Sequence, residues 1–158
     1  ARGAVNKMSL LALVHPERVI TASSGNHGSS VAYASKILEF ESLIFLPETV
    51  SSAKLSKIEQ FGAQVQIGGK DSGDAEQAAR AYALKHGYPY VSPYNDYDVI
   101  AGQGTIAAEV SQQVSGIDAV FIAVGGGGLI SGIGSYLNQM HPSVQIIPCS
   151  PEHSASMH

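Results

Sequence analysis

The feature that most constrains the fold of this chain is a regular alternation of short apolar runs with helical patterns. The apolar runs lie at 18–21, 43–46, 65–67, 90–91, 119–124 and 144–149. Helical patterns lie at 2–14, 27–40, 51–61, 74–86, 99–114 and 129–140. Strand followed by helix, repeated, is typical of parallel sheets that helices cover on both faces. We therefore expect an α/β fold built from open, mostly parallel sheets.

Glycines and prolines divide this pattern. Gly62, Gly87 and Gly116 follow helical patterns, where a left-handed residue commonly ends a helix. The stretch 88–98 contains two prolines and few helix formers, so we expect the chain to cross between two domains there, near Asn95.

The composition excludes several classes of protein. The 158 residues are 44% hydrophobic, enough for a sizeable core, and only 14% are charged, so part of the surface is expected to lie against other protein. The net charge is −4 without a basic stripe, so we expect no nucleic-acid partner. No apolar run approaches the roughly 20 residues of a membrane span, and the first residues lack the apolar stretch and cleavage site expected of a secretory signal. The single Cys149 cannot form an internal disulfide, which favours a cytoplasmic location.

Both ends of the chain resemble interruptions of a longer one. The helical pattern at 2–14 has no Ser, Thr, Asp or Asn before it to cap its first turn. The last residues, 154–158, are typical of the first turn of a helix that does not continue. We expect the fold to be incomplete at both ends.

The first chemical feature is the segment Ser23-Ser-Gly-Asn-His-Gly28, which follows an apolar run and opens a helix. Ligands bind at this end of the strands in an open parallel sheet, and the free amides of a helix start attract anions. An N-cap alone would explain one Ser or Asn, whereas here four polar or glycine positions follow one another. The segment predicts a cup for a small anion or a planar polar ring.

The second feature is Gly125-Gly-Gly-Gly-Leu129, again between strand and helix. Four glycines cost about 1 kcal/mol each relative to Ala in regular structure, but they let several backbone amides surround one phosphate. A tight flexible turn is the alternative interpretation. If the two loops face one cleft, they fit an enzyme that acts on a small amino or hydroxy acid.

Four ordered motifs identify a family resemblance. Ala1-Arg-Gly-Ala4, the segments 23–28 and 125–129, and Val99-Ile-Ala-Gly-Gln-Gly-Thr105 occur in the order and spacing of the threonine dehydratase, serine dehydratase and serine racemase family. The chain thus resembles a pyridoxal-phosphate enzyme of fold type II, with the tryptophan synthase β-like architecture. The resemblance implies that 1–17 is a helix of a large domain, 18–95 a small substrate-binding domain and 96–158 part of the large cofactor-binding domain.

The resemblance implies a lyase with pyridoxal 5′-phosphate as cofactor. It would convert L-threonine, L-serine or a related β-hydroxy amino acid to a 2-keto acid and ammonia. The lysine that carries the cofactor as a Schiff base is expected immediately before Ala1, because a Ser-Phe-Lys motif precedes Arg-Gly-Ala in that family. Serine racemase activity is one alternative, and a non-catalytic paralogue without this lysine is another. The family also suggests a homodimer.

The resemblance assigns roles to individual residues. Ser23, Asn26 and His27 would hold the substrate carboxylate, and Asn26 would also bond the cofactor's 3′-oxygen. Ser24 matches the hydroxyl that delivers a proton to the face opposite the lysine in racemases, which makes it the candidate catalytic residue. The cofactor phosphate would be bound by Gly125, Gly126, Gly127, Gly128 and Leu129.

Two other features of the motifs are expected not to carry ligands. Gly102-Gln-Gly-Thr105 is interpreted as a helix-packing segment. Racemases of the family bind a divalent cation with a Glu and an Asp where this chain has Ser150 and Ser156, so we expect no metal.

Other enzyme classes fit the sequence less well. A nicotinamide-binding fold lacks its acidic residue, because the strand after the glycine run ends in Pro148-Cys-Ser150. A nucleotide-binding P-loop fails at Asp71, which follows Gly69-Lys70 where Ser or Thr is needed. The six His residues and one Cys show no zinc spacing. Within the pyridoxal class, the cysteine synthase branch usually has Thr at the position of His27.

Overall fold

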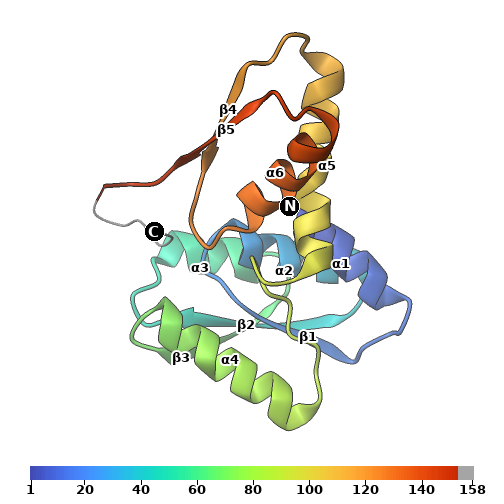
Figure 1. The fold of residues 1–158 in the computed structure, drawn as a ribbon. Coiled ribbons are helices and arrows are strands. Elements are labelled where there is room, and N and C mark those ends of the chain that lie inside the picture. The colour runs from blue at the N-terminus through green and yellow to red at the C-terminus, as the bar shows by residue number, and fades with distance from the viewer. Residues whose placement is uncertain (153–158) are drawn as a thin grey trace. The chain divides into compact units, whose positions relative to one another are not determined.

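The computed structural model describes residues 1–152, which form six helices and five strands (Figure 1). In chain order the elements are α1 (Arg2–Ala12), β1 (Arg18–Ala22), α2 (Asn26–Leu38), β2 (Glu41–Pro47), α3 (Ser52–Glu59), β3 (Gln64–Gly69), α4 (Ser72–His86), α5 (Tyr97–Gln113), β4 (Ala119–Ala123), α6 (Gly128–Met140) and β5 (Gln145–Cys149). The expected start of a helix at 154–158 lies outside the described residues.

Residue contacts divide the chain into two compact units. The first unit is Gly3–Ser92 with Ala1, and the second runs from Pro93 onward and includes Arg2. The domain boundaries expected from the sequence, after 17 and near Asn95, stay predictions.

The first unit is built on a parallel sheet with the strand order β1-β2-β3. Arg18 opposes Glu41 where β1 and β2 begin, and their side chains form an ion pair that raises the pKa of the Arg18 guanidinium. Tyr90 adds a parallel bridge to Ile20 at the free edge of β1. The predicted strand at 90–91 is therefore reduced to this bridge.

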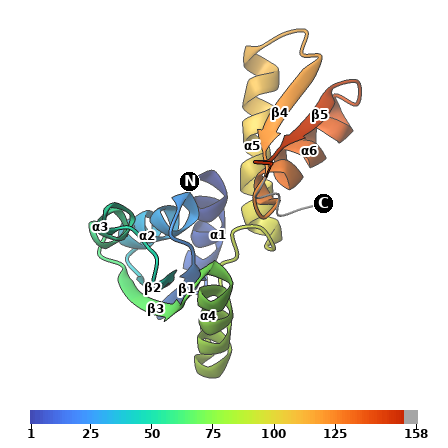
Figure 2. The same cartoon turned by 90° about the vertical axis from the view of Figure 1, so that its left-hand side faces the viewer.

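The central strand β2 supplies both cores of the first unit, because helices cover both faces of the sheet (Figures 1 and 2). Leu43 and Phe45 pack against α4, whose Ala75, Ala79 and Ala83 recur every fourth residue and let the helix lie close. On the opposite face, the other side chains of β2 pack against α2 and α3; these are Ile44 and Leu46. This alternation explains why β2 is a continuous apolar run.

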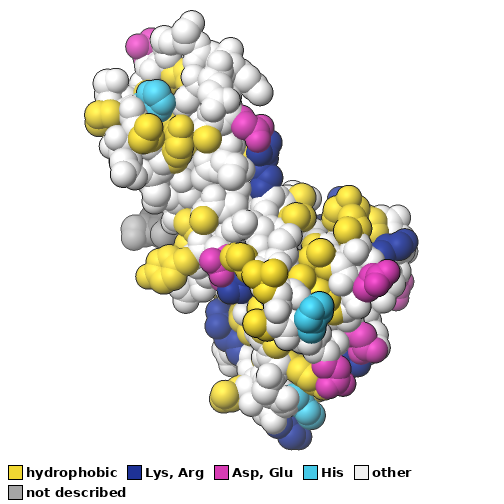
Figure 3. All heavy atoms as spheres, turned by 90° about the vertical axis from the view of Figure 1, so that its right-hand side faces the viewer, with side chains coloured by type: hydrophobic (Ala, Val, Ile, Leu, Met, Phe, Trp, Pro, Cys, Tyr) yellow, Lys and Arg dark blue, Asp and Glu magenta, His cyan; other side chains and the backbone are white. Residues whose placement is uncertain are grey.

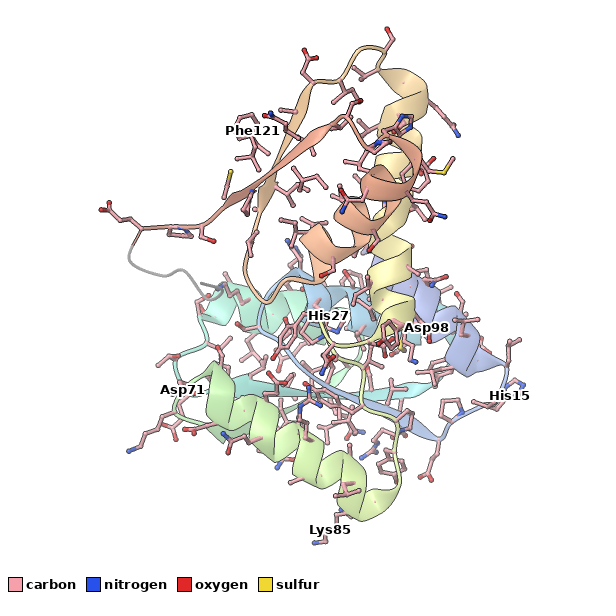
Figure 4. The ribbon with its side chains drawn as sticks, in the orientation of Figure 1. His15, His27, Asp71, Lys85, Asp98 and Phe121 are labelled. Atoms are coloured by element: carbon pink, nitrogen blue, oxygen red, sulfur yellow. The ribbon has the colours of Figure 1, made fainter. Side chains whose placement is uncertain are left out.

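The second unit pairs β4 and β5 in parallel, with α5 and α6 packed on one face. Ile122, Ile133 and Leu137 form its buried core together with Ala107. The side chain of Phe121 projects from β4 on the side away from the helices and is 72% exposed (Figure 4). Parallel sheets are normally covered on both faces, so this face supports the expectation that some of the surface lies against other protein.

Helices α5 and α6 touch through glycine. A Cβ atom on Gly132 would lie 2.3 Å from the carbonyl oxygen of Ile100 and 2.7 Å from the amide nitrogen of Gly104. A Cβ on Gly104 would in turn lie 3.1 Å from the Gly132 oxygen. The interpretation of 102–105 as a packing segment is confirmed, because only glycine allows this approach.

The structure confirms the α/β fold with parallel sheets and the three glycine helix ends. Gly62, Gly87 and Gly116 have φ of 83°, 71° and 69°. Two helices begin earlier than predicted, because aspartates cap them: Asp71 accepts hydrogen bonds from the amides of Gly73 and Asp74 at the start of α4. Asp96 caps α5 in the same way.

On the face shown in Figure 3, the Lys and Arg side chains stand apart and do not merge into one basic patch. Among residues 1–152, no helix is both long enough and apolar enough to cross a membrane.

The glycine contact between α5 and α6 generates a stability prediction. Gly132→Ala should lower the free energy of unfolding of the full-length protein by about 1–3 kcal/mol, because the new methyl group overlaps backbone atoms that cannot rotate away. The matched control is Gly134→Ala in the same helix, where the nearest atom to the new Cβ is 3.5 Å away. This control should be neutral or slightly stabilising because Ala favours helix. Equal urea midpoints for the two variants would contradict the packing described.

Candidate active site

A tight turn joins β1 to α2 in the first unit. A Cβ on Gly28 would lie 2.0 Å from the carbonyl oxygen of Ser23, so the helix begins directly against the end of the strand. Ser23, Ser24 and His27 are half-buried, and Asn26 is exposed. The structure therefore brings together all four residues that the sequence predicts in this loop, at the carboxyl end of β1.

The first turn of α2 has no side-chain cap. Its N-cap residue is Gly25, and no side-chain hydrogen bond caps the helix. Ser29 and Ser30 donate backward to the carbonyl oxygens of Gly25 and Asn26, at 3.2 Å and 2.6 Å. The interpretation of the polar run as a simple N-cap is therefore wrong. The first backbone amides of any α-helix have no acceptor within the helix, and in α2 no side chain caps them.

His27 is tied to the sheet by its ring. Its Nε2 lies 3.2 Å from the carbonyl oxygen of Val91, which also accepts a 2.7 Å hydrogen bond from Thr21 Oγ1. Because a carbonyl can only accept, Nε2 carries a proton in this arrangement. Figure 4 shows His27 at the start of α2. What His27 offers an anion in the loop is thus its backbone amide rather than Nε2.

A pocket of about 320 Å³ lies beside this loop within the first unit. Asn26 forms part of its wall, and so does Ala1. The remaining lining residues come from α2, from α3 and from Phe61, which follows α3: Ser29, Ser30, Tyr33, Lys57 and Phe61. Ala1 therefore lies on the same pocket as Asn26.

The second loop joins β4 to α6 in the second unit. Gly127 is the N-cap residue with φ of 89°, a left-handed conformation that disfavours other residues, and no side chain caps the helix. Gly125 and Gly126 are exposed, and a Cβ on Gly125 would meet nothing within 4 Å. Open space in front of uncapped helix amides fits a phosphate, because the amides and the helix dipole both favour an anion.

One neighbour of this loop was missed by sequence reasoning about the glycines. A Cβ on Gly126 would lie 2.2 Å from Cδ1 of Tyr94, and one on Gly128 would lie 2.5 Å from the carbonyl oxygen of Pro93. The family resemblance puts Tyr94 where relatives have a residue beside the cofactor ring, and the irregular stretch around Pro93 predicts a crossing, but neither predicts this contact.

The described part of the chain contains no group of three His, Cys, Asp or Glu side chains that could hold a metal ion. Ser150 Oγ donates to the carbonyl oxygen of Val124 at 3.2 Å, next to the glycine loop. Ser156 lies outside the described residues. The expectation of no metal at these positions stays a prediction.

Comparison with known proteins decides the family. The family model described as "Pyridoxal-phosphate dependent enzyme" matches residues 1–158. The chain belongs to this family. The predicted resemblance to fold-type II pyridoxal-phosphate enzymes and the predicted cofactor are confirmed.

Individual relatives agree with the family. The chain is 41% identical over 157 residues to threonine dehydratase 2 of Solanum lycopersicum, and it covers 26% of that protein. It is 39% identical to L-threonine ammonia-lyase of Thermotoga maritima, of which it covers 39%; both alignments include 99% of this chain. The crystal structure of serine racemase from Dictyostelium discoideum matches with a TM-score of 0.85 and 34% identity, over 96% of this chain and 50% of that one. The chain therefore spans half or less of each of these relatives.

The roles of individual residues in this pyridoxal-phosphate family member stay predictions. The structure groups Ser23, Ser24, Asn26 and His27 in one loop and Gly125–Leu129 in another, each within its own unit. That both loops serve one cofactor is a prediction as well.

Glycine at position 28 generates the prediction for this site. Gly28→Ala should lower the Tm of the full-length protein by several degrees, about 1–3 kcal/mol of overpacking, because the methyl group would overlap the Ser23 carbonyl. Gly25→Ala is the control, since its nearest neighbour would be Ser23 Oγ at 4.0 Å. Thermal denaturation of both variants checks this, and a Tm for Gly28→Ala as high as that of Gly25→Ala would show that the turn is looser than described.

Proposed function

We propose that this chain is the central part of a pyridoxal-phosphate-dependent dehydratase. The substrate is L-threonine, L-serine or a related β-hydroxy amino acid, and the products are a 2-keto acid and ammonia. The observation that carries the proposal is the pair of helix starts at α2 and α6, each of which follows a parallel strand, has glycine as its N-cap residue and lacks a side-chain cap. Relatives named threonine dehydratase and L-threonine ammonia-lyase support the reaction class.

The cofactor's phosphate would be held by the amides of Gly125, Gly126, Gly127, Gly128 and Leu129. Asn26 would donate from its side-chain amide to the 3′-oxygen of the ring. Asn26, Gly125 and Gly126 are exposed and Leu129 is partly exposed, whereas Gly127 and Gly128 are buried. When bound, pyridoxal phosphate draws negative charge from the α-carbon of an amino acid into its ring.

The substrate carboxylate would lie at the first turn of α2. Ser23, Asn26 and His27 would surround it, and His27 would contribute its amide nitrogen, because its Nε2 lies against the Val91 carbonyl oxygen. A lysine immediately before Ala1 would carry the cofactor and move the α-proton. The pocket lined by both Ala1 and Asn26 supports this, because a residue joined to Ala1 would then be near the residue that would orient the ring.

Serine racemase activity is the second candidate. The structural match to a serine racemase supports it, and Ser24 supplies a half-buried hydroxyl in the loop that would face the substrate. Elimination remains the main proposal, because Ser150 stands where the racemases' cation-binding Glu would be and Ser is a poor substitute for it. A non-catalytic paralogue would lack the lysine before Ala1.

The location, the oligomeric state and the partners of the enzyme are also proposals. We propose a cytoplasmic homodimer that acts on small amino acids without nucleic-acid or membrane partners. The family suggests the dimer, and the low fraction of charged residues supports buried protein contacts.

Spectroscopy and product analysis of the full-length protein test the proposal. The purified protein should be yellow, and its visible absorbance should change when serine or threonine is added. A panel of β-hydroxy amino acids should give 2-keto acid faster than D-amino acid, measured by keto-acid derivatisation and chiral chromatography. Dominant D-serine would favour the racemase, and a colourless protein that ignores both substrates would contradict both activities.

A further inference from the structure

We propose that Tyr94 is a positioning residue that shapes the phosphate loop at 125–128 by packing its ring against Gly126. The inference rests on the proposed function of that loop as the cofactor's phosphate site. It goes further by assigning the need for glycine at 126 to a protein side chain instead of to the ligand.

The contact at Gly126 involves ring atoms alone. A Cβ built on Gly126 would lie 2.2 Å from Cδ1, 2.7 Å from Cγ and 2.9 Å from Cε1 of Tyr94. Side-chain carbons in contact normally stay about 3.5–4.0 Å apart, so the ring occupies the space that any other residue at 126 would need. The Tyr94 ring therefore forms one wall of the loop, and Gly126 lies against it.

Gly128 has a different neighbour. A Cβ there would lie 2.5 Å from the Pro93 carbonyl oxygen and 2.9 Å from the Tyr94 Cα atom, both of which belong to the backbone. Removing the Tyr94 ring would leave these atoms in place. The two glycines thus respond differently to the same change at position 94, although they are only two residues apart.

The Tyr94 segment is held in place by the residues that follow it at the start of α5. Two residues after Tyr94, the Asp96 carboxylate accepts hydrogen bonds from the amides of Asp98 and Val99, at 2.9 Å and 3.3 Å, and so sets the start of α5. Val99 is fully buried. Helix α5 in turn meets α6 at Gly132, one turn beyond the loop. The segment 93–94 is therefore held where it can define the shape of the loop.

Each of the four glycines at 125–128 therefore has a different structural environment. Gly125 faces open space, Gly126 faces the Tyr94 ring, Gly127 has a φ of 89°, and Gly128 faces backbone. Substitution of Gly126 should be the one whose damage can be relieved by a change at position 94.

A double-mutant cycle on the full-length protein tests this. The variants are Gly126→Ala, Tyr94→Ala and the two combined, and the measurement is the dissociation constant for pyridoxal phosphate from its visible absorbance. Gly126→Ala should weaken binding about tenfold or more, because the methyl group displaces the loop or the ring. The double variant should bind at least about threefold more tightly than Gly126→Ala alone, which is strong non-additivity.

The matched control is the same cycle at Gly128. Gly128→Ala should weaken binding too, but Tyr94→Ala should give it no relief, because the obstructing atoms are backbone. Tyr94→Phe keeps all three ring carbons and should bind pyridoxal phosphate like the wild type, whereas Tyr94→Ala alone should bind more weakly. The Tm shift caused by inorganic phosphate gives a second readout that needs no catalysis.

The outcomes separate the two proposals. A wild-type protein that binds neither pyridoxal phosphate nor inorganic phosphate overturns the proposed function of the loop. A wild type that binds both, with additive effects of Gly126→Ala and Tyr94→Ala, overturns the role of Tyr94. If Gly126→Ala does not fold, the affinities of Tyr94→Phe and Tyr94→Ala for pyridoxal phosphate decide instead. Wild-type affinity in Tyr94→Ala then overturns the inference.

Discussion

Close approach of one backbone to another governs both candidate loops. The start of α2 lies so near the end of β1 that Gly28 leaves no room for a Cβ beside the Ser23 carbonyl. In the second unit, Gly128 and Gly132 bring α6 against the segment that leads into α5 and against α5 itself. A methyl group at Gly28 would push the β1–α2 junction apart, and one at Gly128 or Gly132 would push α6 away from the segment before α5 or from α5 itself.

Because both junctions are glycine-rich, neither helix start is capped by a side chain. Two other helices have side-chain caps, because Asp71 and Asp96 accept hydrogen bonds from first-turn amides of α4 and α5, whereas α1 and α3 have none. What distinguishes the starts of α2 and α6 is a glycine at the N-cap, Gly25 and Gly127, and helix-start amides at the carboxyl end of parallel strands attract anions. Phosphate and carboxylate are the anions that a pyridoxal-phosphate enzyme must hold.

Much of this could be predicted from the sequence, because alternating strands and helices, and glycine at Gly62, Gly87 and Gly116, are local signals. The helix starts at Asp71 and Asp96 were missed by two residues each, since capping competes with apolar periodicity. The contact of Tyr94 with Gly126 could not be predicted, because it joins residues far apart in the chain. Nor could the tie between His27 and Val91, which depends on how the segment after α4 returns to β1.

The most direct test of the account is the response of the glycine amides to the cofactor. Full-length protein labelled with ¹⁵N-glycine would be titrated with pyridoxal phosphate and followed by two-dimensional NMR. The account predicts that the amide signals of Gly125, Gly126, Gly127 and Gly128 shift most, while those of Gly62 and Gly116 at helix ends stay unchanged. Cofactor binding that leaves the signals of 125–128 in place would contradict the assignment of this loop as the phosphate site.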